Sequence, residues 1–205
     1  MAGQPIVVVP IVLASSSATR QRMLREAGLA FDSQSPGVDE EEVKLSLKGS
    51  KASAAQIAET LAELKALRVS QGRQEALVIG ADQVLDCNGT LFDKPPDMDH
   101  AKAQLMALRG KTHVLATAVC VAQNGARLWH HNAQAKLTMR NFSDEFLDRY
   151  LGEAGEDVLS SVGVYRLEGP GAQLFTKVDG DFFTILGLPL LPLLDFLRGR
   201  GAVAQ

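Results

Sequence analysis

The longest regular pattern in the chain is a pair of strand-like segments joined by a tight turn. Thr112–Ala122 and Ala126–Met139 have the apolar content of strands, and Gln123-Asn124-Gly125 lies between them. Asn-Gly is a common sequence in the two-residue turns of β-hairpins, because both residues tolerate positive φ angles. The pattern therefore predicts a long antiparallel hairpin, around which the remaining elements must form a sheet.

Strands and helices alternate in the first half of the chain. Ile6–Ala14 and Ala76–Ala81 are nearly continuous apolar runs, which is typical of buried strands. Ala18–Ala27 and Ser53–Val69 place apolar residues at helical spacing. We therefore predict an α/β protein with α+β character, whose mixed, twisted sheet is flanked by helices.

Shorter patterns complete the prediction. The acidic cluster Asp39–Glu42 is interpreted as a loop, and so is Glu153–Asp157. The 205 residues lie between one and two average domains, and we interpret residues 1–205 as one unit with two lobes. The other predicted elements are strands at Phe31–Ser33, Gly163–Glu168 and Gln173–Val178, a hairpin in Val84–Leu91, helices over Asp99–Leu108 and Ser143–Leu151, and helical turns at Asp181–Gly187 and Leu190–Leu197.

The charge and the cysteines limit the functional class. The formal net charge is −3, which argues against a nucleic-acid-binding protein but allows a basic pocket of ligand size. Cys87 and Cys120 show no metal-ligand spacing, and two isolated thiols suit a reducing cytoplasm. The apolar run Ile6–Ala14 is too short for a membrane span, so we expect a cytoplasmic protein without a membrane partner.

The serine-rich turn before the first predicted helix could bind an anion. Ser15, Ser17 and Arg20 follow the first strand, where hydroxyls, backbone N–H groups and a helix N-terminus would surround a phosphate. The alternative is structural: Ser17 caps the helix and Arg20 is a solvated side chain.

A second set of residues could supply acid–base and metal chemistry. Asp82 follows a buried strand and could hold a divalent metal or deprotonate water, or it could be an ordinary turn residue. The cluster Asp39–Glu42 could add a second carboxylate. Lys65 and Lys94 could neutralise a leaving phosphate, although most lysines only face solvent. The four histidines lack the spacing of a zinc hydrolase.

The order of six short motifs is more specific than any one of them. These motifs are Leu13-Ala14-Ser15-Ser16-Ser17-Ala18-Thr19-Arg20, Gly80-Ala81-Asp82-Gln83, Lys94-Pro95, Leu108-Arg109-Gly110-Lys111-Thr112-His113-Val114, Gly163–Gly169, and Asp179-Gly180-Asp181 with Gly187-Leu188-Pro189. From about Val12 to Leu197 the chain resembles the Maf family of nucleoside triphosphate pyrophosphatases. The resemblance implies a Maf/ITPase-like fold with a central cleft between two lobes. It also implies metal-dependent hydrolysis of a nucleoside triphosphate to the monophosphate and pyrophosphate, which clears unwanted nucleotides from the pool.

The resemblance also assigns roles to individual residues. It implies that Asp82 is the catalytic carboxylate and that Glu40 occupies the family's acidic position after the second strand. Our hypothesis is that Mg²⁺ or Mn²⁺ binds between Asp82 and Glu40, and that Asp82 acts as the base or only as a metal ligand. The residues that match the family's substrate-binding positions are Ser15, Ser17, Arg20, Lys65 and Lys94.

Three further residues match positions linked to base selection, namely Thr19, Gln83 and Glu168. Gln83 and Glu168 resemble the 7-methyl-GTP branch of the family, whereas Thr19 matches neither that branch nor the one selective for uridine and thymidine nucleotides. We therefore expect a purine-type substrate. The alternatives are a non-catalytic nucleotide-binding regulator of cell division and septum formation, and a phosphatase that releases orthophosphate. A homodimer is compatible with the sequence, which reveals no interface.

Overall fold

A mixed β-sheet forms the centre of the computed structural model, which describes residues 9–204. Its strands run in the order β2-β1-β3-β5-β6-β7, and β4 pairs with β3 outside this series. β1 is parallel to β2 and β3, and the other pairs are antiparallel. The strands are β1 (Ile11–Leu13), β2 (Asp32–Ser33), β3 (Leu77–Cys87), β4 (Thr90–Phe92), β5 (Thr112–Gln123), β6 (Ala126–Met139) and β7 (Phe175–Asp179).

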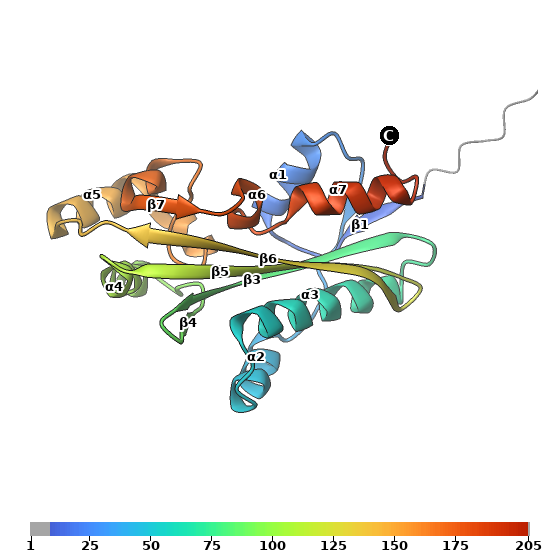
Figure 1. The fold of residues 1–205 in the computed structure, drawn as a ribbon, viewed down its shortest axis with the longest axis horizontal. Helices are drawn as coiled ribbons and strands as arrows, with labels where there is room; N and C mark the ends of the chain where they lie inside the picture. Colours follow the sequence, from blue (N-terminus) through green and yellow to red (C-terminus); the bar gives the residue numbers. More distant parts are fainter. Residues whose placement is uncertain (1–8, 205) are drawn as a thin grey trace, which may run out of the picture.

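Helices cover both faces of this sheet, which confirms the predicted fold class. Figure 1 shows α3 along one face with α2 beside it, and α1, α6 and α7 on the opposite face. The helices are α1 (Ala18–Glu26), α2 (Glu40–Gly49), α3 (Ala54–Ser70), α4 (Met98–Leu108), α5 (Asp144–Ala154), α6 (Phe182–Ile185) and α7 (Leu190–Gly199), with 3₁₀ segments at Gly155–Ser160 and Pro170–Leu174.

Local sequence signals account for the elements that were predicted well. Asn124 and Gly125 have φ angles of 52° and 76° in the turn between β5 and β6, as the Asn-Gly signal indicates. Asn88 and Gly89 form the equivalent turn between β3 and β4. Ser53 caps α3, because its hydroxyl accepts from the backbone N–H of Gln56 and the Gln56 side chain accepts in return.

Four predicted segments differ in the structure. Asp39–Glu42 is not a loop: Asp39 caps α2, and three glutamates occupy the first turn, where the helix dipole favours negative charge. Gly163–Glu168 is not a strand, because Gly163 and Val164 adopt positive φ angles of 85° and 64°. Glu153–Asp157 ends α5 and enters a 3₁₀ segment. Of the strand predicted at Ile6–Ala14, only Ile11–Leu13 is observed, and residues 6–8 lie outside the described part of the chain.

The strand β3 packs unusually close to helix α3. A Cβ atom added to Gly80 would lie 2.2 Å from the carbonyl oxygen of Ala62 and 2.7 Å from the backbone nitrogen of Ala66. Because side chains alternate between the faces of a strand, Asp82 shares the α3 face with Gly80, and Gln83 points to the opposite face. The glycine therefore lets α3 approach the strand that carries Asp82.

The sheet has an opening beside the middle of β3. β3 pairs with β1 only over Leu77–Ile79 and with β4 only over Leu85–Cys87, whereas β5 runs along the other side of β3 throughout. Between these two pairings, residues 80–84 have no strand on the β1 side within the described chain. The turn after β1 and the segment after β4 therefore leave the sheet on either side of this opening.

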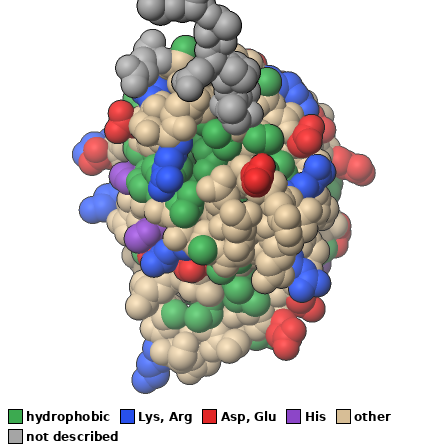
Figure 2. Space-filling view, turned by 90° about the vertical axis from the view of Figure 1, so that its right-hand side faces the viewer, with side chains coloured by type: hydrophobic (Ala, Val, Ile, Leu, Met, Phe, Trp, Pro, Cys, Tyr) green, Lys and Arg blue, Asp and Glu red, His purple; other side chains and the backbone are tan. Residues whose placement is uncertain are grey.

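The face of the molecule shown in Figure 2 carries no large basic patch. Acidic and basic side chains are interspersed on the face shown in Figure 2. Within residues 9–204, no helix combines the length and the apolar character needed to cross a membrane.

Candidate active site

A cavity of about 880 Å³ lies at the opening in the sheet, and it collects every residue predicted to belong to the site. The predicted residues in its wall are Ser15, Ser17, Thr19, Arg20, Glu40, Lys65, Asp82, Gln83, Lys94 and Glu168. They come from the β1–α1 turn, α1, α2, α3, β3, the segment after β4 and the loop after the first 3₁₀ segment. Segments far apart in the sequence thus line one cavity.

Glu40, Lys65 and Asp82 form an acid–lysine cluster in the cavity wall. The Lys65 Nζ atom lies 2.6 Å from Asp82 Oδ1 and 2.8 Å from Glu40 Oε1. Asp82 and Lys65 are only 5% and 4% exposed, and such burial of charged side chains normally requires pairing. Asp82 lies in the middle of β3, and not after its end as the sequence suggested, because Lys65 compensates its charge there.

One carboxylate oxygen of this cluster has no partner among the described residues. Asp82 Oδ2 is buried and accepts no hydrogen bond from them, whereas Oδ1 is bound to Lys65. A buried carboxylate oxygen without a donor costs free energy unless a ligand satisfies it. Asp82 is therefore equipped to accept a proton or to bind a cation from the cavity.

The pKa of Glu40 reflects its cationic neighbours. Burial alone would raise the pKa of this carboxyl, but the charge and hydrogen bond of Lys65, together with the charges of Lys44 and Lys94, lower it below its ordinary value. Glu40 is therefore ionised at neutral pH, and the cluster offers two carboxylates to one cation.

The serine-rich turn holds Arg20 at the cavity. Arg20 Nε donates to the carbonyl oxygen of Gly187 at 2.8 Å, and its Nη1 donates to Ser15 Oγ at 3.3 Å. Ser17 caps α1 by accepting from the backbone N–H of Arg20, so its capping role and its place in the cavity wall coexist. Burial lowers the pKa of Arg20, and the charges of Asp82 and Glu40 partly offset this effect.

Lys94 follows β4 on the other side of the opening. Burial and the charge of Arg20 lower the pKa of Lys94. The charge of Glu40 opposes this shift, Lys65 adds to it, and Asp82 again opposes it. Two cationic groups close enough to repel each other are typical of a site that binds a polyanion.

Gln83 faces the opposite side of the sheet from Asp82. Its Nε2 atom donates to Thr117 Oγ1 at 2.8 Å and to the carbonyl oxygens of Thr184 and Ile185 at 2.9 and 3.2 Å. Because all three partners are hydrogen-bond acceptors, the amide atom that faces them is the nitrogen, and both of its hydrogens are used in these bonds. Gln83 therefore presents its oxygen to the cavity, whereas the sequence alone allowed both donor and acceptor. Thr19 lines the same cavity without a distinctive contact.

Glu168 is held by two arginines. Its Oε1 atom accepts from Arg22 Nη2 at 2.7 Å and from Arg166 Nε at 3.4 Å. Burial acts to raise the pKa of Glu168, but a backbone N–H group and the two arginines lower it below its ordinary value. The carboxylate is therefore ionised at neutral pH.

Buried hydrogen bonds fix the Glu168 loop, residues 161–169. Tyr150 donates its hydroxyl to the carbonyl oxygen of Val164 at 2.9 Å, and Ser161 Oγ donates to that of Tyr165 at 2.8 Å. The Tyr165 hydroxyl lies 2.8 Å from His113 Nε2, and burial lowers the pKa of His113 to about 4. Neutral His113 is thus a structural residue.

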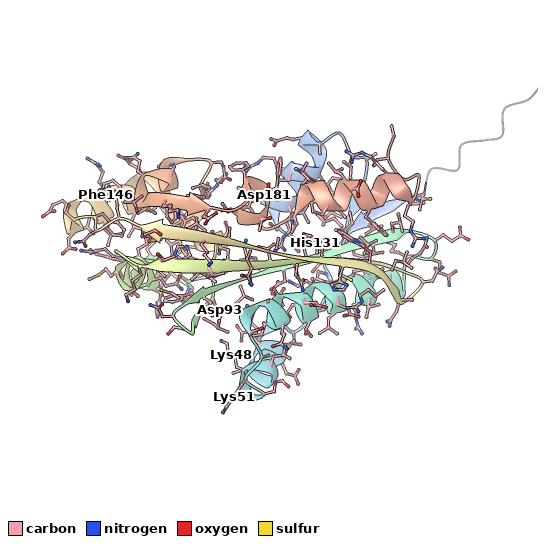
Figure 3. The ribbon with its side chains drawn as sticks, viewed as in Figure 1. Lys48, Lys51, Asp93, His131, Phe146 and Asp181 are labelled. Carbon is pink, nitrogen blue, oxygen red and sulfur yellow. The ribbon has the colours of Figure 1, made fainter. Side chains whose placement is uncertain are left out.

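Sequence reasoning missed the basic residues on α2. Lys44 and Lys48 line the cavity four and eight residues after Glu40. Asp93 Oδ1 binds Lys44 Nζ at 2.6 Å, and Asp93 Oδ2 lies 3.6 Å from Lys48 Nζ. Figure 3 shows Lys48 and Asp93 on the side of the sheet that carries α2. The spacing of four residues would have revealed this face if Asp39–Glu42 had been interpreted as the start of a helix.

The acid–lysine cluster is compatible with a divalent cation, although it does not form a complete metal cage. Asp82 Oδ2 has no partner within residues 9–204, and carboxylate oxygens are the preferred protein ligands of Mg²⁺. Among the described residues, no group of three or more His, Cys, Asp and Glu side chains is placed to hold a metal ion. Mg²⁺ commonly needs only one or two carboxylates when substrate phosphates supply the other ligands.

The chain is similar to known proteins over nearly its whole length. The family model described as "Maf-like protein" matches residues 10–200. A protein of Paramagnetospirillum magneticum named nucleoside triphosphate pyrophosphatase is 60% identical over 190 residues, which cover 93% of this chain and 98% of that protein. A protein of the same name from Caulobacter vibrioides is 52% identical over 196 residues, or 96% of this chain and 98% of that protein. A Brucella abortus protein named 7-methyl-GTP pyrophosphatase is 48% identical over 190 residues, or 93% and 96%.

Proposed function

The chain belongs to the Maf family, and from this premise we propose that it is a nucleoside triphosphate pyrophosphatase. In this reaction, water adds to the α-phosphorus and the bond to the β-phosphate breaks, which yields the monophosphate and pyrophosphate. One observation carries the proposal: Arg20, Lys65 and Lys94 reach one cavity from three distant segments and meet the carboxylates of Glu40 and Asp82 there.

The charge of the cavity supports a polyanionic substrate. Six cationic and five anionic side chains line it, so its formal net charge is +1 in a chain whose net charge is −3. Local positive potential in a cleft attracts anions independently of the net charge of the protein. A triphosphate would add several negative charges, and a divalent cation bound with it would restore the balance.

Each charged residue of the cavity has its own role in the proposed hydrolytic step. Asp82 Oδ2 takes the proton of the attacking water, because this oxygen is unpartnered. Arg20 neutralises charge on the α-phosphate, and Lys65 and Lys94 stabilise the departing pyrophosphate as its charge grows. In an alternative role, Asp82 acts only as a metal ligand.

A divalent cation, Mg²⁺ or Mn²⁺, is part of the proposal. Asp82 and Glu40 would hold it, and when bound it would withdraw charge from the phosphate oxygens. Lys65 contacts both carboxylates in the structure, so it keeps them close together before a cation enters.

The side chains at Gln83 and Glu168 support a purine substrate of the guanine type. An ionised Glu168 can only accept hydrogen bonds, which suits the N1–H and N2–H₂ groups of guanine, and its charge also suits a cationic methylated purine. The oxygen of Gln83 is a second acceptor. The relatives named for 7-methyl-GTP agree with this preference, and we propose that triphosphate as the first candidate.

The test is a side-by-side assay of 7-methyl-GTP, GTP, UTP and dTTP with Mg²⁺ and with Mn²⁺, in which the released anion is identified. We expect pyrophosphate and a preference for the guanine nucleotides. Asp82→Asn provides the control for contaminating enzymes, because it should lose nearly all turnover and stay folded. Release of orthophosphate would indicate a phosphatase, and nucleotide binding without metal-stimulated turnover would indicate a non-catalytic regulator. A clear preference for UTP and dTTP would refute the role of Glu168.

A further inference from the structure

We propose that Arg22 is a positioning residue that holds the Glu168 carboxylate so that only one of its oxygens, Oε2, faces the nucleobase. The proposal rests on the proposed function and deepens it. Arg22 lies on α1, outside the cavity wall, whereas Glu168 lies in the wall. Arg22 would therefore act on base recognition through Glu168 and not by contacting the substrate.

The contact between the two side chains is short and partly shielded from water. Arg22 Nη2 lies 2.7 Å from Glu168 Oε1, and the two side chains are 37% and 22% exposed. Arg22 Nε also lies 3.9 Å from Glu26, but the Glu26 side chain is 71% exposed, so water weakens that pair. Glu168 is thus the principal partner of Arg22.

The two arginines engage the same oxygen of Glu168. Arg166 Nε approaches Oε1 at 3.4 Å, and its Nη1 lies 3.5 Å from Asp157 Oδ2. A carboxylate oxygen accepts about two hydrogen bonds, so Oε1 is filled by Arg22 and Arg166. No hydrogen bond to Oε2 is found within the described chain. The ionised group therefore keeps one acceptor atom for a ligand.

Arg22 is also where the Glu168 loop meets a different element. Tyr150, Ser161 and His113 fix the loop backbone around Val164 and Tyr165, but these contacts lie three residues or more before Glu168. The Glu168 side chain is instead attached to α1, the helix that carries Arg20. Arg20 and Arg22 are two positions apart on a helix and so point to different sides, one toward Gly187 and one toward Glu168. Helix α1 therefore carries both Arg20, which lies at the acid–lysine cluster, and Arg22, which binds the proposed base acceptor Glu168.

A double-mutant cycle tests this assignment. Arg22→Gln, Glu168→Gln and the double variant are compared with the wild type for KM and kcat, by pyrophosphate release from the triphosphate that the wild type prefers. We expect Arg22→Gln to raise KM about tenfold, the usual scale for a lost charge-assisted hydrogen bond, and to change kcat less than about twofold. In the Glu168→Gln background, the same change should have no further effect on KM.

Two matched variants complete the design. Arg22→Lys keeps the charge but loses the planar guanidinium, so we expect its KM to lie between those of the wild type and of Arg22→Gln. Arg25→Gln removes another arginine of α1, which contacts Gln21 at 2.8 Å and does not line the cavity, and it should leave KM and kcat unchanged.

An unchanged KM in Arg22→Gln would overturn the proposal. An equal effect of Arg22→Gln in both backgrounds would also overturn it, because Arg22 would then act independently of Glu168. Absence of pyrophosphate release by the wild type would instead refute the proposed function. The same cycle would then be followed through the Kd of the α,β-methylene analogue of GTP, measured by calorimetry.

Discussion

The acid–lysine cluster and the Glu168 loop line one cavity but are built in opposite ways. Lys65 and Asp82 lie within a regular helix and strand, are almost fully buried and contact each other directly. Glu168 lies in irregular backbone and depends on arginines that are more than a third exposed. The cluster is fixed by the core of the protein, whereas the loop is fixed by contacts near the surface. The proposed base-binding side could therefore change without rebuilding the proposed reacting side.

Substitution of one carboxylate on each side gives the largest expected contrast. Asp82→Asn should lower kcat by about 10²- to 10⁴-fold, the range typical of a lost general base. Glu168→Gln should raise KM about tenfold for a guanine nucleotide and lower kcat by no more than about threefold. Steady-state kinetics with circular dichroism as a folding control would measure both. A large fall of kcat in both variants would contradict the assignment of the reaction step to the acid–lysine cluster and of base binding to the Glu168 loop.

The close packing behind the cluster gives the next largest effect. Gly80→Ala would place a methyl group 2.2 Å from the Ala62 carbonyl, which forces α3 away from β3. We expect a loss of about 3 kcal/mol in the free energy of unfolding, at the upper end of overpacking, measured by urea denaturation. Activity should fall as well, because Lys65 moves with α3.

Gly152→Ala is the matched control for this substitution. Gly152 lies inside α5, and an added Cβ meets no atom within 4 Å. The change should leave stability equal or slightly higher, because alanine favours the helix. A similar loss in both variants would show that Gly80 has no special role.

The buried support of the Glu168 loop predicts a smaller effect. His113 Nδ1 already lacks a partner in the described part of the chain, and Tyr165→Phe would remove the partner of Nε2 too. We expect a loss of about 1–2 kcal/mol in the free energy of unfolding. Because the pKa of His113 is about 4, the loss should be the same at pH 6 and pH 8. A loss that grows between those pH values would contradict a neutral His113.

The smallest expected effect is the pH dependence that Glu40 adds to stability. Its pKa in the folded protein lies below the ordinary value of 4.5, so its ionised form stabilises the fold above that pH. This contribution is lost as the pH falls through the lower, folded-state pKa. The Glu40 side chain is 41% exposed, and solvent screening should limit the contribution to less than about 1 kcal/mol.

Urea denaturation of the wild type and Glu40→Gln at pH 7, 5 and 3 would measure this contribution. The wild type should be more stable at pH 7, and the difference should shrink at pH 3. A difference that increases toward acid pH would contradict the assigned direction of the pKa shift.

A structural feature is predictable from this sequence when the residues that determine it lie close together in the chain. The hairpin around Asn124-Gly125 and the capped helix α3 were predictable, because turn and capping signals lie within a few residues. For the acidic start of α2 a high local charge favours a loop, but Asp39 followed by glutamates is also a helix-start pattern, and the structure shows the helix. For Gly163–Glu168 the local pattern predicts a strand, whereas Val164 has a positive φ angle and its carbonyl oxygen accepts from Tyr150, 14 residues earlier in the chain.

The same distinction applies to the site. The motif order was sufficient to select ten residues that line one cavity. The pairing within that cavity was not predictable from local patterns. Lys65 precedes Asp82 by 17 positions, and the Arg22–Glu168 contact spans 146. The sequence alone also placed Asp82 after its strand, since a buried charge in mid-strand is stable only with a partner supplied by another element.

The opening beside β3 has a consequence for how ligand binding can be observed. Within the described chain, residues 80–84 pair with β5 on one side only, so about half of their backbone groups face the opening in the sheet, where Asp82 and Gln83 line the cavity. Amide hydrogens on that side should exchange with solvent deuterium faster than those bonded to β5. A nucleotide that fills the cavity should slow their exchange, while the far end of the β5–β6 hairpin stays unaffected. Amide exchange at the incompletely paired part of β3 would thus show whether a nucleotide is bound in the cavity.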